Sequence, residues 1–142
     1  MIQVPYSLLA QMHFQQAVQK LANSPLKDPV AFQIKHMTKA LRDGYFAMKE
    51  EYQKTIESKY AEKEAGKIVP PKEGSKAAEL ELPFACEDAK TGDLKGALDA
   101  FYAQKLKVEK KKIPFEVMFR ANEWTPRELE TLEAIIEEPT DA

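Results

Sequence analysis

The chain has little of several residue types on which small catalytic and binding sites depend. Its 142 residues include one cysteine, five glycines and two histidines. The single cysteine, Cys86, excludes an intramolecular disulfide framework, and a cysteine-based zinc site would need three further ligands. So few glycines leave little material for a phosphate-binding loop, and the sequence contains no P-loop or dinucleotide-binding glycine motif.

The sequence also lacks long hydrophobic runs and an excess of one charge. No stretch approaches the roughly 20 apolar residues that a transmembrane helix requires, so we expect no membrane partner. The first six residues lack the basic region that begins a signal peptide, and a cytoplasmic protein of the host cell is therefore expected. The formal net charge of −2 provides no overall basic field to attract nucleic acid.

No familiar arrangement of catalytic or metal-binding residues is present. His13 and His36 are far apart, and neither has an acidic or cysteine neighbour at a usual ligand spacing, so both are interpreted as partly exposed helix residues. Cys86 is followed by Glu87 and Asp88, whose carboxylates oppose thiolate formation. Neither Gly-x-Ser-x-Gly nor His-Glu-x-x-His occurs. We predict a protein that is not an enzyme, with no catalytic residues, no cofactor and no metal.

What is present fits one globular domain over residues 1–142, because the chain is 44% hydrophobic and 31% charged. Residues 1–67 are expected to form a helical hairpin, and residues 68–142 a mixed α+β part. The alternation of Ile2–Val4 before Pro5 predicts a short edge strand. A helix is expected to follow, from an N-cap at Ser7 to about Ala22.

The strongest pattern in the chain predicts a long central helix. Asp28 is a good N-cap, Pro29 suits the first helical position, and Gly66 is a good residue for the end. Such a helix is roughly 55 Å long, whereas the helix over residues 7–22 is only about 24 Å long. This mismatch is our main reason to expect an interaction protein. Gly44, in the middle, indicates an incidental loss of helix stability, close packing of a neighbouring element, or a kink.

An apolar stripe recurs along this helix at steps of three and four residues. Its second half consists of Tyr45, Met48, Tyr52, Ile56 and Tyr60. Tyrosine and methionine suit a partly exposed interface, because they bury area while tolerating water at its edge. The stripe therefore has two interpretations: a docking surface for a partner or a second copy of the chain, or core that packs against the second half of the chain.

The second half of the sequence predicts short strands and helices. The alternation over Glu79–Phe84 favours a half-buried strand. A turn at Thr91 and Gly92 is expected to precede a helix that is capped by Asp93 and reaches Leu106. Residues 107–112 and 115–119 look extended. The class is therefore α+β and mainly α: a long central helix in a helical hairpin, with a small β-sheet and short helices in the C-terminal half.

A capping box begins the last predicted helix. Thr125, Pro126 and Glu128 have the spacing of a side-chain cap with proline at the first helical position. The apolar face of this helix is expected to consist of Leu129, Leu132, Ile135 and Ile136, with its end at Pro139. Trp124 precedes the cap, where it is expected either to form a hydrophobic staple with Leu129 or to anchor an interface.

One local excess of positive charge stands out. It consists of Lys105, Lys107, Lys110, Lys111 and Lys112. This basic patch is able to contact phosphates, with Phe115 and Phe119 as stacking surfaces behind it. The favoured interpretation is different: lysines guard exposed strand edges, and the acidic C-terminus is available to neutralise them.

The order of these elements is similar to that of a family of small uncharacterised proteins from phage and prophage structural-gene clusters. The resemblance rests on the end of the long helix and on the final helix. The segments are Tyr60-Ala61-Glu62-Lys63-Glu64-Ala65-Gly66-Lys67 and Leu129-Glu130-Thr131-Leu132-Glu133-Ala134-Ile135-Ile136-Glu137. The family brings no activity and no site residues with it. It implies a virion structural or assembly component, and the virion as a second location.

Taken together, the sequence predicts a non-enzymatic protein that binds another protein or itself. The alternative is a small nucleic-acid-binding or regulatory protein that uses the basic patch over residues 105–112. Nucleic acid is the less favoured partner of the two.

Overall fold

The structure is a computed structural model that describes residues 2–25, 29–119 and 122–137. It is 58% helical with 11% strand, which confirms the predicted α+β, mainly α class. The chain forms two compact units, one of residues 1–46 with 104–142 and one of residues 47–103. These limits differ from the expected division at residue 67. The expected helix cap at Asp28 and the expected helix end at Pro139 lie outside the described residues.

The predicted N-terminal strand is present in the first unit. Strand β1 (Ile2–Pro5) pairs antiparallel with β4 (Lys105–Val108), with Ile2 opposite Val108. Ile2, Val4 and Val108 are buried, because alternate side chains of a strand point to one face. Strand β4 accounts for the beginning of the segment that was expected to be extended.

The first predicted helix is divided in two. Helix α1 (Tyr6–Leu9) has its N-cap at Pro5 rather than at the expected Ser7, and α2 (Met12–Ala22) follows. Gln11 between them has an extended backbone, with ψ of 133°. The interruption lets Leu9 and Phe14 both be fully buried, although residues five apart on a continuous helix would point in different directions.

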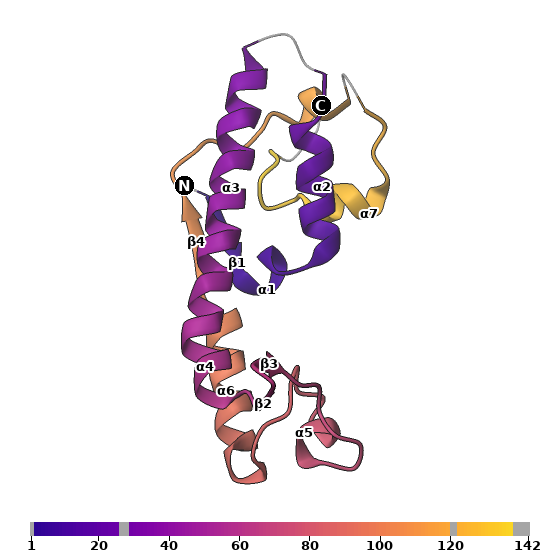
Figure 1. Ribbon diagram of the computed structural model, residues 1–142. Helices are drawn as coiled ribbons and strands as arrows, with labels where there is room; N and C mark the ends of the chain where they lie inside the picture. The colour runs from indigo at the N-terminus through magenta and orange to yellow at the C-terminus, as the bar shows by residue number, and fades with distance from the viewer. Residues whose placement is uncertain (1, 26–28, 120–121, 138–142) are drawn as a thin grey trace. The chain divides into compact units, whose positions relative to one another are not determined.

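The long helix is confirmed, but it ends earlier than the sequence indicates. Helix α3 (Val30–Tyr52) continues through a π-helical turn (Gln53–Glu57) into α4 (Ser58–Tyr60). Figure 1 shows α2 beside the first part of α3, the expected helical hairpin. Gly66 does not cap the helix. With φ of 79°, after Ala65 with φ of 50°, it forms the turn between β2 (Lys63–Glu64) and β3 (Lys67–Ile68).

Gly44 allows a neighbouring strand to approach α3 closely. A Cβ atom at this position would lie 2.4 Å from Cδ2 of Leu106. Of the three interpretations of this glycine, the structure therefore supports close packing. Leu106 itself lies in β4, so the prediction that it belongs to the preceding helix was wrong.

The second unit contains the clearest failure of a sequence pattern. Glu79–Phe84 does not form the predicted strand, because α5 (Lys76–Glu79) ends inside it. Glu81 adopts a left-handed conformation, its N–H binds the carbonyl of Ala78, and the N–H of Leu82 binds that of Ala77. This is a Schellman helix end, in which the buried Leu82 and Ala77 occupy its hydrophobic positions.

The next helix begins before its expected cap. Helix α6 (Thr91–Tyr102) follows a 3-10 turn (Asp88–Lys90), so the turn predicted at Thr91 and Gly92 was wrong. The buried hydroxyl of Thr91 donates a hydrogen bond of 2.8 Å to the carbonyl of Asp88, which joins the two elements. Asp93 therefore lies in the first turn of α6 and does not cap it.

The C-terminal part of the first unit is less regular than expected. Residues Phe115–Phe119 form a 3-10 helix instead of a strand, starting after Pro114. Helix α7 (Pro126–Thr131) begins at the predicted capping box and ends at Thr131, earlier than expected. Ile135 and Ile136 are buried beyond its end, where the backbone N–H of Ile113 binds the carbonyl of Ile135 at 2.8 Å. Ile135 and Ile136 therefore belong to the hydrophobic core although they are not part of the helix.

Candidate interaction surface

The apolar stripe that was a candidate docking surface is largely packed. Met48 and Ile56 are each 3% exposed, and the three tyrosines of the stripe are half-buried. In the second unit, the ring of Tyr52 lies 5.5 Å from that of Phe101 and 6.4 Å from that of Tyr102. Burial, with the neighbouring Tyr102 and Glu57, raises the pKa of Tyr52 to about 12. This packing favours the core interpretation for Met48, Tyr52 and Ile56.

The basic patch is exposed to solvent. All five of its lysines are exposed, and none forms an ion pair with a carboxylate in the described parts of the chain. Its backbone is held from α3, because the side-chain amide of Gln33 donates to the carbonyls of Lys111 and Lys112 at 3.3 and 3.1 Å. Lys105 and Lys107 project from the solvent side of β4, since Val108 points to the core.

Cys86 has the character of a structural cysteine. Its side chain is buried, and burial raises the pKa of the thiol, with further contributions from Glu62 and Glu87. The two histidines are exposed on α2 and α3. Within the described ranges, no three His, Cys, Asp or Glu side chains are arranged to hold a metal ion.

A different part of α3 presents large apolar side chains to solvent. Phe32 is 66% exposed and Phe46 is 59% exposed, although most phenylalanines of a folded protein are buried. They are nearly four helical turns apart, and therefore lie on one face about 21 Å apart along the axis. The buried residues Ile34 and Leu41 lie on the opposite face.

Three cationic side chains lie between these phenylalanines and line a groove between α2 and α3. Lys35, Lys39 and Arg42 follow each other at steps of four and three, so they form one row on the helix. The groove has a volume of about 320 Å³, within the range of ligand pockets. Its described lining also includes Gln15, Val18, Gln19, Ala22, Ala31, Ile34 and Thr38. None of these lining residues is acidic.

We define the α3 surface as Phe32, Lys35, Lys39, Arg42 and Phe46. It was not among the sites predicted from the sequence, although the sequence contains a signal for it. The residues of the periodic apolar stripe in the first half of the long helix, such as Ile34, Met37 and Leu41, are buried. Phe32 and Phe46 do not fit that periodicity, and aromatic residues outside a helix's apolar stripe are candidates for binding.

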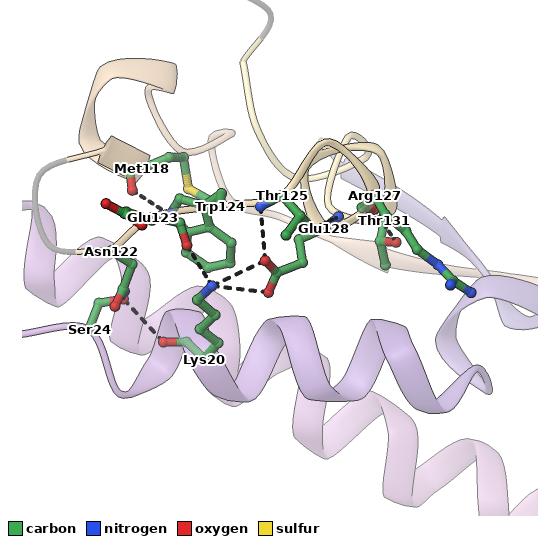
Figure 2. A network of polar contacts seen from close by, with 10 residues as sticks. All are labelled: Lys20, Ser24, Met118, Asn122, Glu123, Trp124, Thr125, Arg127, Glu128 and Thr131. Carbon is green, nitrogen blue, oxygen red and sulfur yellow. Dashed lines mark hydrogen bonds and ion pairs between the residues drawn. The ribbon is translucent and has the colours of Figure 1, made fainter.

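The helix that forms the other wall of the groove is anchored to the C-terminal segment. The ammonium of Lys20 on α2 lies 3.1 Å from both carboxylate oxygens of Glu128 and 4.6 Å from the ring centre of Trp124 (Figure 2). The indole N–H of Trp124 donates to the carbonyl of Met118. Trp124 is half-buried, and the hydrophobic staple with Leu129 stays a prediction.

The capping box of α7 completes this network. The backbone N–H of Thr125 donates to Glu128 at 3.0 Å, and the backbone N–H of Glu128 donates to the Thr125 hydroxyl at 3.2 Å. The first of these bonds is the main reason that the pKa of Glu128 is lowered, and Lys20 lowers it further. The network therefore joins α2, which forms one wall of the groove, to the start of α7.

Comparison of the chain with models of protein families, with curated proteins and with solved structures finds no match. The resemblance to proteins of phage structural-gene clusters therefore remains a prediction. None of the described helices is both long and apolar enough to cross a membrane. What the fold defines is a mainly helical α+β protein whose most distinctive surface feature is the α3 surface.

Proposed function

We propose that the chain is a non-enzymatic protein–protein interaction protein that binds its partner through the α3 surface. The observation that carries this proposal is the exposure of Phe32 and Phe46 on one face of a helix. Exposed aromatic residues near arginine are typical of interface anchors, because burying them on binding removes a large apolar area from water. The resemblance stated above favours a partner in virion structure or assembly.

Site-specific photo-crosslinking tests this proposal. A photoreactive phenylalanine analogue replaces Phe32 or Phe46 in cells that express the protein, and Gln16, an exposed residue of α2, serves as the control position. We expect a discrete protein adduct from both α3 positions and none from position 16. The partner identified by mass spectrometry is then purified, and its affinity is measured against Phe32→Glu and Phe46→Glu. Adducts that are equal at all three positions, or an unchanged affinity, would contradict the proposal.

The basic patch supports a second candidate, binding of nucleic acid. The supporting observation is that all five lysines are exposed without a described ion-pair partner. Binding of this kind weakens steeply with salt, because it releases counterions from the phosphates. The test is the salt dependence of binding to a single-stranded oligonucleotide, for the wild type and for the triple variant Lys105→Gln, Lys107→Gln and Lys110→Gln. Affinity that is unchanged in this variant excludes the candidate.

A further inference from the structure

The groove between α2 and α3 combines two kinds of wall. Its apolar floor is made by the buried residues Val18 and Ile34. One rim carries the row of Lys35, Lys39 and Arg42. The described lining holds no acid, and the exposed Asp43, which follows Arg42 on α3, lies outside that lining. Because the whole chain has a net charge of −2, this local row of like charges is not a consequence of a generally basic surface.

We infer that this groove binds an acidic amphipathic segment of a partner protein. The inference rests on the proposed function and specifies the chemistry of the partner. Acidic side chains at steps of four and three on a helical segment would match Lys35, Lys39 and Arg42 one to one. Apolar side chains on the same segment would pack on the groove floor and against Phe32 and Phe46, which lie beyond the two ends of the cationic row.

The charge pattern disfavours two other occupants. Two copies of the chain that met symmetrically through the α3 surface would place the same three cations opposite one another, which repels. A nucleic acid would satisfy the cations, and its bases could stack on the two phenylalanines, but it would leave the apolar floor of Val18 and Ile34 without an apolar partner. A protein segment with both acidic and apolar residues matches both features of the groove.

Selection from a displayed library of random peptides tests the inference without assuming a sequence. The full chain is the bait, and the triple variant Lys35→Gln, Lys39→Gln and Arg42→Gln is used for counter-selection. We expect enrichment of peptides that combine acidic residues with aromatic or aliphatic ones. A synthetic peptide of the enriched consensus should bind the wild type about ten-fold or more tightly than the triple variant, since three charge-assisted contacts are lost.

The chain offers a matched control on its other basic element. The variant Lys105→Gln, Lys107→Gln and Lys110→Gln removes the same charge from exposed positions of the basic patch. It should retain wild-type affinity for the consensus peptide. Equal losses in the two variants, enrichment of neutral or basic peptides, or no enrichment would each overturn the inference. Oligothymidine that binds as tightly as the peptide, with the same loss in the groove variant, would assign the groove to nucleic acid instead.

Self-association of the chain through the groove is tested separately. Sedimentation velocity compares the purified chain with the triple variant Lys35→Gln, Lys39→Gln and Arg42→Gln. We expect that any concentration-dependent dimer of the wild type persists in this variant. A dimer that is lost in this variant would overturn the inference and assign the groove to a second copy. The inference and the proposed function fail separately. If cross-linking identifies a partner at Phe32 and Phe46 but the peptide selection fails, the function stands and the groove assignment falls.

Discussion

The ammonium of Lys20 on α2 lies 3.1 Å from each carboxylate oxygen of Glu128, in the first turn of α7. The same carboxylate accepts the backbone N–H of Thr125, and so closes the capping box of that helix. The capping box, a local feature of the sequence, therefore also positions the Glu128 carboxylate, which accepts hydrogen bonds from Lys20 more than a hundred residues away in the chain. This shared carboxylate couples the start of α7 to its attachment to α2, and the first two predictions depend on it.

The first prediction concerns the pH dependence of stability. The pKa of Glu128 is lower in the folded chain than its ordinary value, so the ionised form is stabilised by folding. This contribution is fully present above the unfolded pKa and is lost as the pH falls through the folded pKa. Glu128→Gln keeps an oxygen that can accept the Thr125 N–H but removes the carboxylate charge that Lys20 and the backbone N–H stabilise, so it should lower the unfolding free energy by about 0.5–1 kcal/mol at pH 7 and by less in acid.

Urea unfolding, followed by the fluorescence of the single tryptophan, measures this difference at neutral and acidic pH. The control is Glu130→Gln, which removes the same charge from an exposed position of α7. It should change the unfolding free energy by less than about 0.5 kcal/mol. A difference between Glu128→Gln and wild type that grows on acidification would contradict the assignment.

The second prediction concerns the coupling of Lys20 to Glu128. Lys20→Met keeps the length of the side chain but removes its charge, its hydrogen bonds and its contact with the ring of Trp124. We expect a loss of about 1–2 kcal/mol. In a double-mutant cycle with Glu128→Gln, the coupling energy should be about 0.5 kcal/mol or more. Strictly additive effects would show that the two residues act independently.

Some local signals predicted structure correctly, and others, such as the expected N-cap at Ser7, did not. The capping box at Thr125 was found because the spacing of its residues specifies two hydrogen bonds by itself. The alternation over Glu79–Phe84 misled, because a Schellman helix end also places a buried residue beside exposed ones. Gly66 suits a helix end and a hairpin turn equally well, and only the neighbouring Ala65, also at positive φ, separates the two.

The candidate site was harder to predict than the fold. Whether a stripe on a long helix is core or interface depends on what the rest of the chain covers, and periodicity carries no information about that. Tyr52 is half-buried against two aromatic residues of α6, about fifty positions further along the chain. The groove depends on the pairing of α2 with α3, so its cations were visible in the sequence, whereas the hollow beside them was not.

The third prediction concerns Gly44. Alanine is the better helix former by about 1 kcal/mol, but its methyl group would overlap Leu106. We expect the overlap to exceed this gain, because three atoms of the half-buried Leu106 side chain lie within 3.2 Å of the added Cβ, so Gly44→Ala should destabilise by about 1 kcal/mol or more. Gly96→Ala on α6 meets nothing within 4 Å and should stabilise the chain slightly. Both values come from thermal or urea unfolding.

A second variant separates overlap from any other effect of alanine at position 44. In the background of Leu106→Ala, the overlapping atoms are absent, so Gly44→Ala should no longer be destabilising there. If Gly44→Ala stabilises the chain in the wild-type background, the Leu106 side chain makes room for the methyl group at little cost, and close packing is not the reason for a glycine here.

The fourth prediction concerns the reactivity of Cys86. Because the thiol is buried and its pKa is raised, it should react with a disulfide reagent far more slowly than free cysteine at neutral pH. Urea that unfolds the chain should restore the rate expected of an exposed thiol. A rapid reaction of the folded protein would mean that the segment around Cys86 opens readily, and would contradict its assignment as structural.

The last prediction concerns the part that Phe32 and Phe46 play in stability. If these side chains are reserved for binding, replacing them should leave folding almost unchanged. Phe32→Ser and Phe46→Ser are suitable because serine and phenylalanine have similar helix propensities. Each should change the unfolding free energy by less than about 0.5 kcal/mol, whereas Phe14→Ser, at a fully buried position, should cost about 3 kcal/mol or more. A loss of several kcal/mol at Phe32 or Phe46 would show that the ring packs within the chain and is not available to a partner.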